Sequence, residues 1–245
     1  MIGRRLTLAL AGLGLAAVSG IFWYFSGCGE VCHFGQSNSF IYRYRLSLEV
    51  ATPEGLKRGS GVLQVHAFDY RGLAGDRGGA ETYGEAVAVD LGPRGSLFAL
   101  LKREYTGRSY TDEFSADVLA RAHHVERGRG NYVPFARRVA AIADVVEVHP
   151  ADLPMLVRFR DINNPATVEK VDPNNLAKSF GAGVKLQRAT LQITSDPVTT
   201  GIEKRLGWLD GLKTGTITGL TMFDPAKPDP INYLEAVTFR YGTQK

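Results

Sequence analysis

A stretch of twenty residues without a charge, residues 6–25, constrains this chain more than any other feature of its sequence. At about 1.5 Å per residue, a helix of that length spans roughly 30 Å, which is the thickness of a bilayer's hydrocarbon core. The sequence therefore predicts a transmembrane helix over residues 6–25, preceded by a short N-terminal segment, residues 1–5.

Positive charges on one side of this stretch predict its orientation. Arg4 and Arg5 precede it, and no Lys or Arg follows it until Arg43. Because positive residues collect on the cytoplasmic side of transmembrane helices, we expect residues 1–5 in the cytoplasm and the bulk of the chain outside. This is the pattern of a signal anchor. Together with the Gly- and Arg-rich, bacterial-looking character of the chain, it predicts a single-pass protein of the bacterial inner membrane, with its C-terminal domain in the periplasm. In a eukaryote the same topology would predict a membrane of the secretory pathway.

Three aromatic residues at the outer end of the stretch fit this reading. Phe22, Trp23 and Tyr24 are expected to form a membrane-interface belt, where amphipathic rings are favoured. A cleavable signal peptide is an alternative, because "AVSG" at residues 17–20 resembles a cleavage site. Cleavage there would leave five large apolar residues exposed without a membrane, so a retained anchor is favoured.

Two cysteines, Cys28 and Cys32, follow the anchor and allow three interpretations. "FSGC", which ends at Cys28, resembles the lipobox of bacterial lipoproteins, and this resemblance implies lipidation of Cys28. In an oxidising compartment, the two thiols are instead expected to form a local disulfide. With His33 they also spell C-x-x-x-C-H, one residue longer than the motif that attaches c-type haem, which makes haem the least favoured interpretation.

Small residues recur every fourth position within the apolar stretch, at Gly12, Ala16 and Gly20. Such a stripe permits close packing of two transmembrane helices. Homodimerisation through the anchor is a weakly supported alternative to a monomer, since small residues are common in apolar helices.

The remaining chain divides into a juxtamembrane linker, residues 26–39, and an extracytoplasmic domain, residues 40–245. Apolar and polar residues alternate from Tyr42 to Val50, which predicts a half-buried strand. Further candidate strands outnumber helices and are separated by Gly- and Pro-rich turns. We therefore expect an α+β domain that is mainly antiparallel, and a division into two small halves near residue 150 stays open.

Several elements of this domain are predicted individually. Residues 62–68 are expected to pair with the first strand across a long loop, and residues 69–84 to form a Gly-rich surface loop. Strands are expected at 85–91 and 96–102, and a closing strand at 233–241. Helices are expected to begin at Thr111 and Pro134.

Motifs for common enzyme classes are absent from the sequence. There is no G-x-S-x-G, S-x-x-K, H-E-x-x-H or G-x-x-x-x-G-K-[ST] pattern, so we assign no catalytic, cofactor or metal-binding residue. The remaining candidate for chemistry is a metal site built on His123, His124 and Glu126, with His66 or His149. Adjacent histidines on a helix point about 100° apart, so solvated side chains at a helix end are the favoured interpretation.

Charge excludes one further class of partner. The net charge is only +4, of which Arg4 and Arg5 supply two, and there is no basic run of the kind that binds nucleic acid. The favoured hypothesis is a membrane-anchored, non-enzymatic domain that binds or scaffolds an envelope protein or a cell-wall component. An extracytoplasmic metal-dependent enzyme, a lipoprotein acylated at Cys28 and a c-type haem protein are the alternatives.

Overall fold

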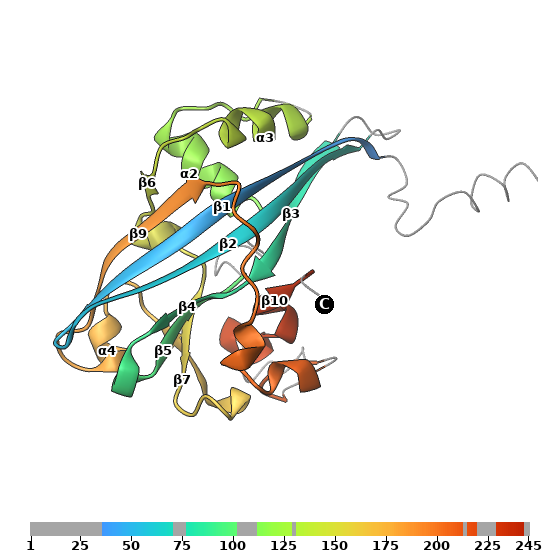
Figure 1. Ribbon diagram of the computed structural model, residues 1–245. Coiled ribbons are helices and arrows are strands. Elements are labelled where there is room, and N and C mark those ends of the chain that lie inside the picture. The colour runs from blue at the N-terminus through green and yellow to red at the C-terminus, as the bar shows by residue number, and fades with distance from the viewer. Residues whose placement is uncertain are drawn as a thin grey trace, which may run out of the picture. The chain divides into compact units, whose positions relative to one another are not determined.

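Figure 1 shows the computed structural model of the chain, in which Ser37–Lys245 form one compact unit. The structure describes residues 36–70, 77–101, 112–128, 131–212, 215–219 and 229–242. The predicted transmembrane helix, aromatic belt and cysteines lie outside these residues. Within the described ranges, no helix is both long enough and apolar enough to span a membrane.

The larger of two sheets, called the long sheet below, is built around two long neighbouring strands (Figure 1). Its strands in spatial order are β10 (Arg240–Tyr241), β3 (Arg77–Glu85), β2 (Gly55–Tyr70), β1 (Gln36–Thr52), β9 (Lys185–Ile193) and β6 (Val146–Glu147). The pairs β10–β3, β3–β2, β1–β9 and β9–β6 are antiparallel. Strands from both sides of residue 150 therefore share one sheet.

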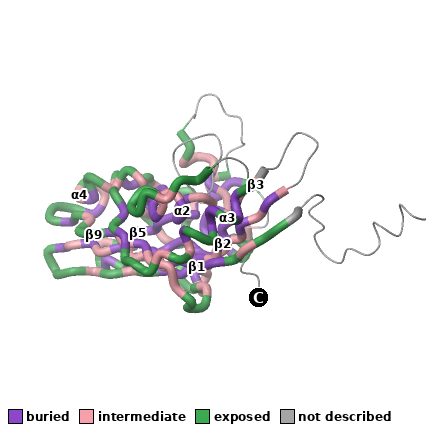
Figure 2. Tube along the Cα trace, turned by 90° about the horizontal axis from the view of Figure 1, so that it is seen from above, coloured by how far each residue is buried: buried purple, intermediate pink, exposed green. Residues whose placement is uncertain are grey.

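Alternation along β1 explains how the long sheet packs. The residues of β1 that point to the inner face are buried, while their neighbours on the outer face stay partly exposed (Figure 2). The buried residues are Tyr42, Tyr44, Leu46, Leu48 and Val50. They belong to a core that also contains buried residues of two helices. The strand predicted from the period of two is confirmed.

The smaller sheet contains four short antiparallel strands. In spatial order these are β4 (Val87–Asp90), β5 (Ser96–Ala99), β7 (Leu156–Phe159) and β8 (Val168–Val171). A 3₁₀ turn at Gly92–Arg94 joins β4 to β5, so the strand pair predicted around "GPRG" is confirmed. Together with the few helices, the two sheets confirm an α+β fold with mainly antiparallel sheets.

Three α-helices are present in the described residues: α2 (Phe114–Ala122), α3 (Val133–Ala140) and α4 (Leu176–Phe180). The helix predicted at Pro134 is confirmed as α3. Its N-terminus is fixed by the buried carboxylate of Asp69, whose Oδ1 accepts backbone N–H groups of Tyr132 (2.5 Å) and Val133 (3.0 Å). The helix expected from Thr111 begins at Phe114, and Thr111 itself lies outside the described residues.

A second core lies between the smaller sheet and C-terminal turns. Phe98 and Phe159 of the sheet pack with Phe239 and with residues of the turns, such as Leu206. The chain in this region consists of short 3₁₀ helices. Across the described residues, these helices are Gly92–Arg94, Pro150–Asp152, Pro165–Thr167, Ile202–Lys204, Leu209–Gly211, Pro230–Tyr233 and Ala236–Thr238.

Two of the predicted loops are wrong. The long loop expected before residue 62 is a tight turn, because β2 already begins at Gly55. A Cβ at Gly59 would overlap the backbone carbonyl of Ala88, so glycine lets this part of β2 lie directly against β4. The loop expected at 69–84 contains β3, where Gly78 passes so close to Tyr132 that a Cβ would meet it at 2.5 Å.

The closing strand expected at 233–241 is also wrong for most of its length. Only Arg240–Tyr241 pair in the long sheet, as β10. Leu234 and Phe239 are both buried in the second core. In a continuous strand their side chains would point to opposite faces, whereas a turn between them lets both point into the core. The backbone N–H of Thr238 accordingly donates to the Glu235 carbonyl at 3.0 Å in a 3₁₀ turn.

Candidate functional site

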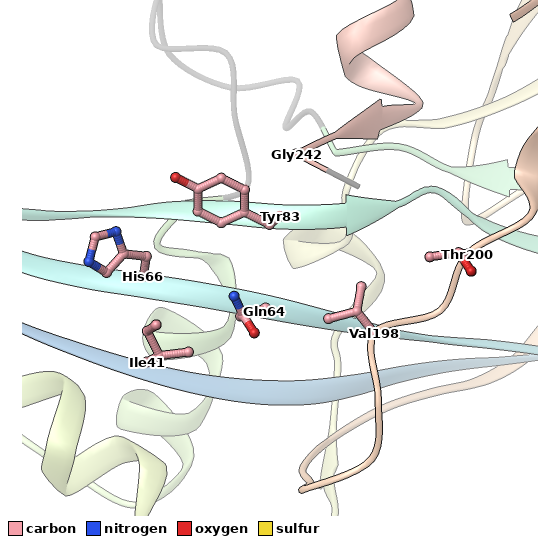
Figure 3. A pocket seen from close by; sticks show the side chains of 7 residues that line it. All are labelled: Ile41, Gln64, His66, Tyr83, Val198, Thr200 and Gly242. Carbon is pink, nitrogen blue, oxygen red and sulfur yellow. The ribbon is translucent and has the colours of Figure 1, made fainter. Parts of the chain in front are cut away.

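A cavity of about 460 Å³ on the outer face of the long sheet is the candidate site, and we call it the outer-face groove (Figure 3). It is lined by Ile41, Gln64, His66, Tyr83, Val198, Thr200 and Gly242. These residues come from three neighbouring strands, from the segment after β9 and from the chain just beyond β10. Protein sites for small ligands typically combine apolar and aromatic walls with a few polar groups, as this groove does.

The floor of the groove follows from alternation in β1 and β2. Gln64 and His66 lie between the buried residues Leu63, Val65 and Ala67, so their side chains point to the outer face. Ile41 projects from the same face of β1 and is 54% exposed, so its side chain is accessible to a ligand. The groove floor therefore offers one apolar, one amide and one imidazole side chain.

One wall is the segment 194–200, which crosses the outer face of the sheet. At one end, the backbone N–H of Thr194 donates to the Arg43 carbonyl at 3.0 Å, and Arg45 forms an ion pair with Asp196. At the other end, Thr199 and Val62 exchange two hydrogen bonds of 2.9 and 3.0 Å. These contacts hold Val198 and Thr200 over the groove (Figure 3).

The opposite wall is Tyr83, whose position is fixed by three neighbours. Its hydroxyl donates to Glu81 Oε2 at 2.5 Å, and its ring stacks on Tyr241 with centroids 5.3 Å apart. Gly242 has a φ of +67°, and a Cβ there would overlap the Tyr83 ring. Burial, followed by the hydrogen bond to the Glu81 carboxylate, raises the pKa of the Tyr83 hydroxyl above its ordinary value.

Charged groups at the margin of the groove are already engaged within the chain. Arg43 Nε donates to Gln64 Oε1 at 3.1 Å, and its Nη1 donates to the carbonyls of Ser195 and Asp196 at 3.4 Å. Glu81 accepts the Tyr83 hydroxyl. Because Gln64 Oε1 already accepts a hydrogen bond from Arg43, the amide nitrogen of Gln64 is the atom that can donate to a ligand. The groove therefore offers hydrogen-bonding groups to a ligand, while the charged groups at its margin, Arg43 and Glu81, are already bonded within the chain.

A second cavity, the acidic cleft, lies on the other side of the Tyr83–Tyr241 pair. Its volume is about 360 Å³, and it is lined by Glu81, Thr82, Leu101, Asp112, Glu235, Val237 and Tyr241. Burial raises the pKa of Asp112 to about 6, with contributions from Glu81 and Glu113, although the Thr82 N–H that donates to Asp112 Oδ1 at 3.0 Å opposes the shift. No His, Cys or Ser is among the described residues that line this cleft.

The histidines considered as metal ligands are not brought together. His66 lies in the outer-face groove, whereas His123 ends α2 with Nε2 3.6 Å from Asp144 Oδ2. His149 instead caps a 3₁₀ turn through Nδ1, which accepts the Ala151 N–H at 3.2 Å. In the described part of the chain, no three His, Cys, Asp or Glu side chains form a group that could hold a metal ion.

The lining of the groove is what sequence reasoning missed. In the sequence, His66 suggests only a possible metal ligand, and residues 62–68 suggest only a strand that pairs with the first one. The available signal was the alternation of Gln64, His66 and Phe68 with small or aliphatic residues. That pattern places three ring or amide side chains on one face of a strand.

The other predicted site residues, Arg4, Arg5, Phe22, Trp23, Tyr24, Cys28 and Cys32, lie outside the described residues. Their roles in topology, interface anchoring and lipidation or disulfide formation stay predictions. Comparisons with known protein families, with curated proteins and with solved structures find no match for this chain.

Proposed function

We propose that this protein is a membrane-tethered binding domain, which holds an uncharged envelope component in the outer-face groove without transforming it chemically. The tether is the apolar stretch at residues 6–25, with Arg4 and Arg5 retained in the cytoplasm. The domain that follows then faces the periplasm, where cell-wall components and the outer parts of envelope proteins are available to it.

The observation that carries this proposal is the composition of the groove. It presents the Ile41 side chain and the Tyr83 ring beside three hydrogen-bonding groups, from Gln64, His66 and Thr200. Apolar contact provides affinity, and a few convergent polar groups provide orientation. The walls are held by hydrogen bonds and an ion pair, so little conformational entropy is lost when a ligand binds.

The same geometry favours binding over catalysis. Nucleophilic catalysis uses a nucleophile such as Ser, Cys, Thr or Lys within hydrogen-bond reach of a base that is itself oriented by a third group. Among the described residues that line the groove, His66 is the one that commonly acts as a base, no Ser, Cys or Lys is present, and no hydrogen bond joins His66 to the Thr200 hydroxyl. The hydroxyl of Tyr83, which the groove does contain, is committed to Glu81 and resists ionisation.

Photo-crosslinking in living cells tests the proposal. The full-length protein carries p-benzoylphenylalanine in place of Ile41, and a matched variant carries it in place of Ser47. Ser47 lies on the outer face of the same strand and pairs with Thr190 of β9, away from the groove. We expect an envelope-derived adduct from position 41 and none from position 47. Equal labelling at the two positions, or no adduct at position 41, would contradict a ligand site in the groove.

A further inference from the structure

A row of three aromatic side chains extends the outer-face groove along β2. His66 and Phe68 have ring centroids 6.0 Å apart at 64°, and Phe68 and Tyr70 have centroids 5.0 Å apart at 66°. All three side chains are partly exposed on the outer face, while Ala67 and Asp69 between them, and Val65 just before them, are buried. We call His66, Phe68 and Tyr70 the ring row.

The neighbouring strand leaves room for these rings. Phe68 pairs with Gly79 of β3, and a Cβ at Gly79 would lie 3.4 Å from two atoms of the Phe68 ring. The ring therefore leans over a position that has no side chain of its own. Gly78, the next residue, pairs with buried Asp69, and a Cβ there would meet Tyr132 instead, so it is Gly79 that leaves the outer face open beside Phe68.

The ring row and the groove share His66 and form one continuous surface. From Gln64 to Tyr70 the strand advances about 20 Å at roughly 3.4 Å per residue. At the groove end, the stacked rings of Tyr83 and Tyr241 stand beside this line. A ligand that follows β2 would thus meet rings at each step of two residues, and polar groups at the groove end.

Charge and hydrogen-bonding capacity indicate what such a ligand is. Arg43 and Glu81 are engaged by Gln64 and Tyr83, so charge complementarity favours a neutral ligand. The Thr200 hydroxyl and a neutral His66 imidazole each both donate and accept hydrogen bonds. Sugar hydroxyls do the same, whereas a proline-rich peptide offers mainly carbonyl acceptors.

A peptide that adds to the sheet as a further strand does not fit this surface. That mode of binding requires the unpaired edge of a sheet. Strand β2, which carries the ring row, lies between β3 and β1 in the order β10-β3-β2-β1-β9, whereas β10 pairs with β3 only at Gly84 and Glu85 and β9 pairs with β1 only from Tyr44 to Ala51. The surface is a sheet face, so its ligand is held through side chains.

We propose that the outer-face groove and the ring row form one binding site for a linear, uncharged polysaccharide that lies along β2. This inference rests on the proposed function and adds the class of ligand and its direction. The polar groove orients one end of the bound segment, and successive sugar rings contact Phe68 and Tyr70.

Binding of size-fractionated oligosaccharides tests this inference. The full-length protein in lipid nanodiscs is titrated with neutral glucan, mannan and galactan series, with an oligogalacturonate and with a proline-rich decapeptide. We expect at least one neutral series to bind, with affinity that rises until the chain covers about 20 Å and then levels off. Tyr70→Ala and Phe68→Ala should each weaken binding about two- to tenfold, and Ser47→Ala should leave it unchanged.

Each contrary result has a distinct meaning. Failure of every neutral series to bind overturns the polysaccharide inference, and so does groove-dependent binding of the decapeptide or oligogalacturonate alone. An affinity that levels off with the shortest chains, together with unchanged binding by Tyr70→Ala, shows that the ring row takes no part. In all these cases an adduct from position 41 in cells would still support the proposed function, whereas its absence would remove that as well. Circular dichroism of Phe68→Ala, with Phe68→Leu as a second variant, separates lost contact from lost folding.

Discussion

The ring of Tyr83 stacks on the ring of Tyr241, with centroids 5.3 Å apart and an angle of 20° between the planes. Tyr83 lines the outer-face groove, and Tyr241 lines the acidic cleft. The stacked pair therefore links the linings of the two cavities, and Gly242 approaches the Tyr83 ring so closely that a Cβ there would overlap it. Changes at this pair are expected to act on the groove directly.

Gly242→Ala should distort the groove. The new Cβ overlaps the Tyr83 ring, and the backbone at φ +67° disfavours any side chain by about 1 kcal/mol or more. Gly92→Ala is the matched control, because Gly92 has a φ of +65° with nothing within 4 Å of a Cβ. Both variants should lose similar conformational stability from the backbone, but only Gly242→Ala should reduce the photo-adduct at position 41. Equal adduct yields would show that Tyr83 does not shape the site.

Asp69→Ala should destabilise the fold substantially. It removes a buried carboxylate and leaves the N–H groups of Tyr132 and Val133 at the start of α3 without their acceptor. We expect a loss of about 2–3 kcal/mol, measured as a decrease in Tm of roughly 5–10 °C. Asp161→Ala removes a similar bond to the Asn163 N–H at an exposed turn, and should cost less than about 0.5 kcal/mol. Comparable shifts for the two variants would show that Asp69 does not cap α3.

Asp112 should make stability depend on pH between about 4 and 6. Its pKa in the folded protein is raised to about 6 from an ordinary 3.8, so the folded state binds this proton more tightly than the unfolded state. The associated stability is present below pH 4 and is lost as the pH rises through 6. Thermal unfolding at a series of pH values should show this loss, and Asp112→Asn should remove it.

Glu54 should affect the pH dependence of stability in the opposite direction, because its pKa is lowered by folding rather than raised. Its hydrogen bond with Arg94 lowers the pKa of Glu54 to about 2 from an ordinary 4.5. Its contribution is present above pH 4.5 and is lost as the pH falls toward 2, so Glu54→Gln should alter only that lower range. If Asp112→Asn left the slope between pH 4 and 6 unchanged, the protonation of Asp112 would not be coupled to folding.

Two buried tyrosine hydroxyls should respond differently to removal. The Tyr132 hydroxyl is buried without a hydrogen-bond partner in the described structure, so Tyr132→Phe should be neutral or stabilising. Tyr42 and Ser115 form a buried hydrogen bond of 3.0 Å, so Tyr42→Phe should cost about 1 kcal/mol or more. Values of Tm for the two variants measure this difference. A loss of stability in Tyr132→Phe as large as in Tyr42→Phe would indicate that Tyr132 has a partner, such as a bound water.

The parts of the fold that could be predicted from the sequence are those with a local signal, such as alternation along a strand or a proline at the start of a helix. The alternation from Tyr42 to Val50 gave β1, and Pro134 marked the start of α3. The regions around Gly59 and Gly78 are predicted as loops, because glycine is common in turns. In the structure these glycines instead lie in strands, where they permit a close approach of a partner segment. Only the folded chain shows that Tyr132 and Ala88 are those partners.

The candidate site could not be predicted from local sequence patterns, because its lining residues are far apart in the sequence. The distance in sequence from Ile41 to Gly242 is almost the length of the domain, and Val198 and Thr200 belong to a segment with no regular structure. No spacing rule connects such residues. Only the side chains of β2 in this site could be predicted from the sequence, since alternation alone places His66 and Phe68 on one face of the strand.

Hydroxyl-radical footprinting of side chains can show whether the outer-face groove is occupied in the native membrane. The protein is compared in its native membrane and after purification into lipid nanodiscs, and oxidation at each residue is read by mass spectrometry. If the groove holds an envelope component, Ile41 and Tyr83 should be less reactive in the native membrane. Leu56 and Val145, which are 42% and 52% exposed elsewhere on the domain, should react equally in both samples. Unchanged reactivity of Ile41 and Tyr83 between the two samples would contradict the account.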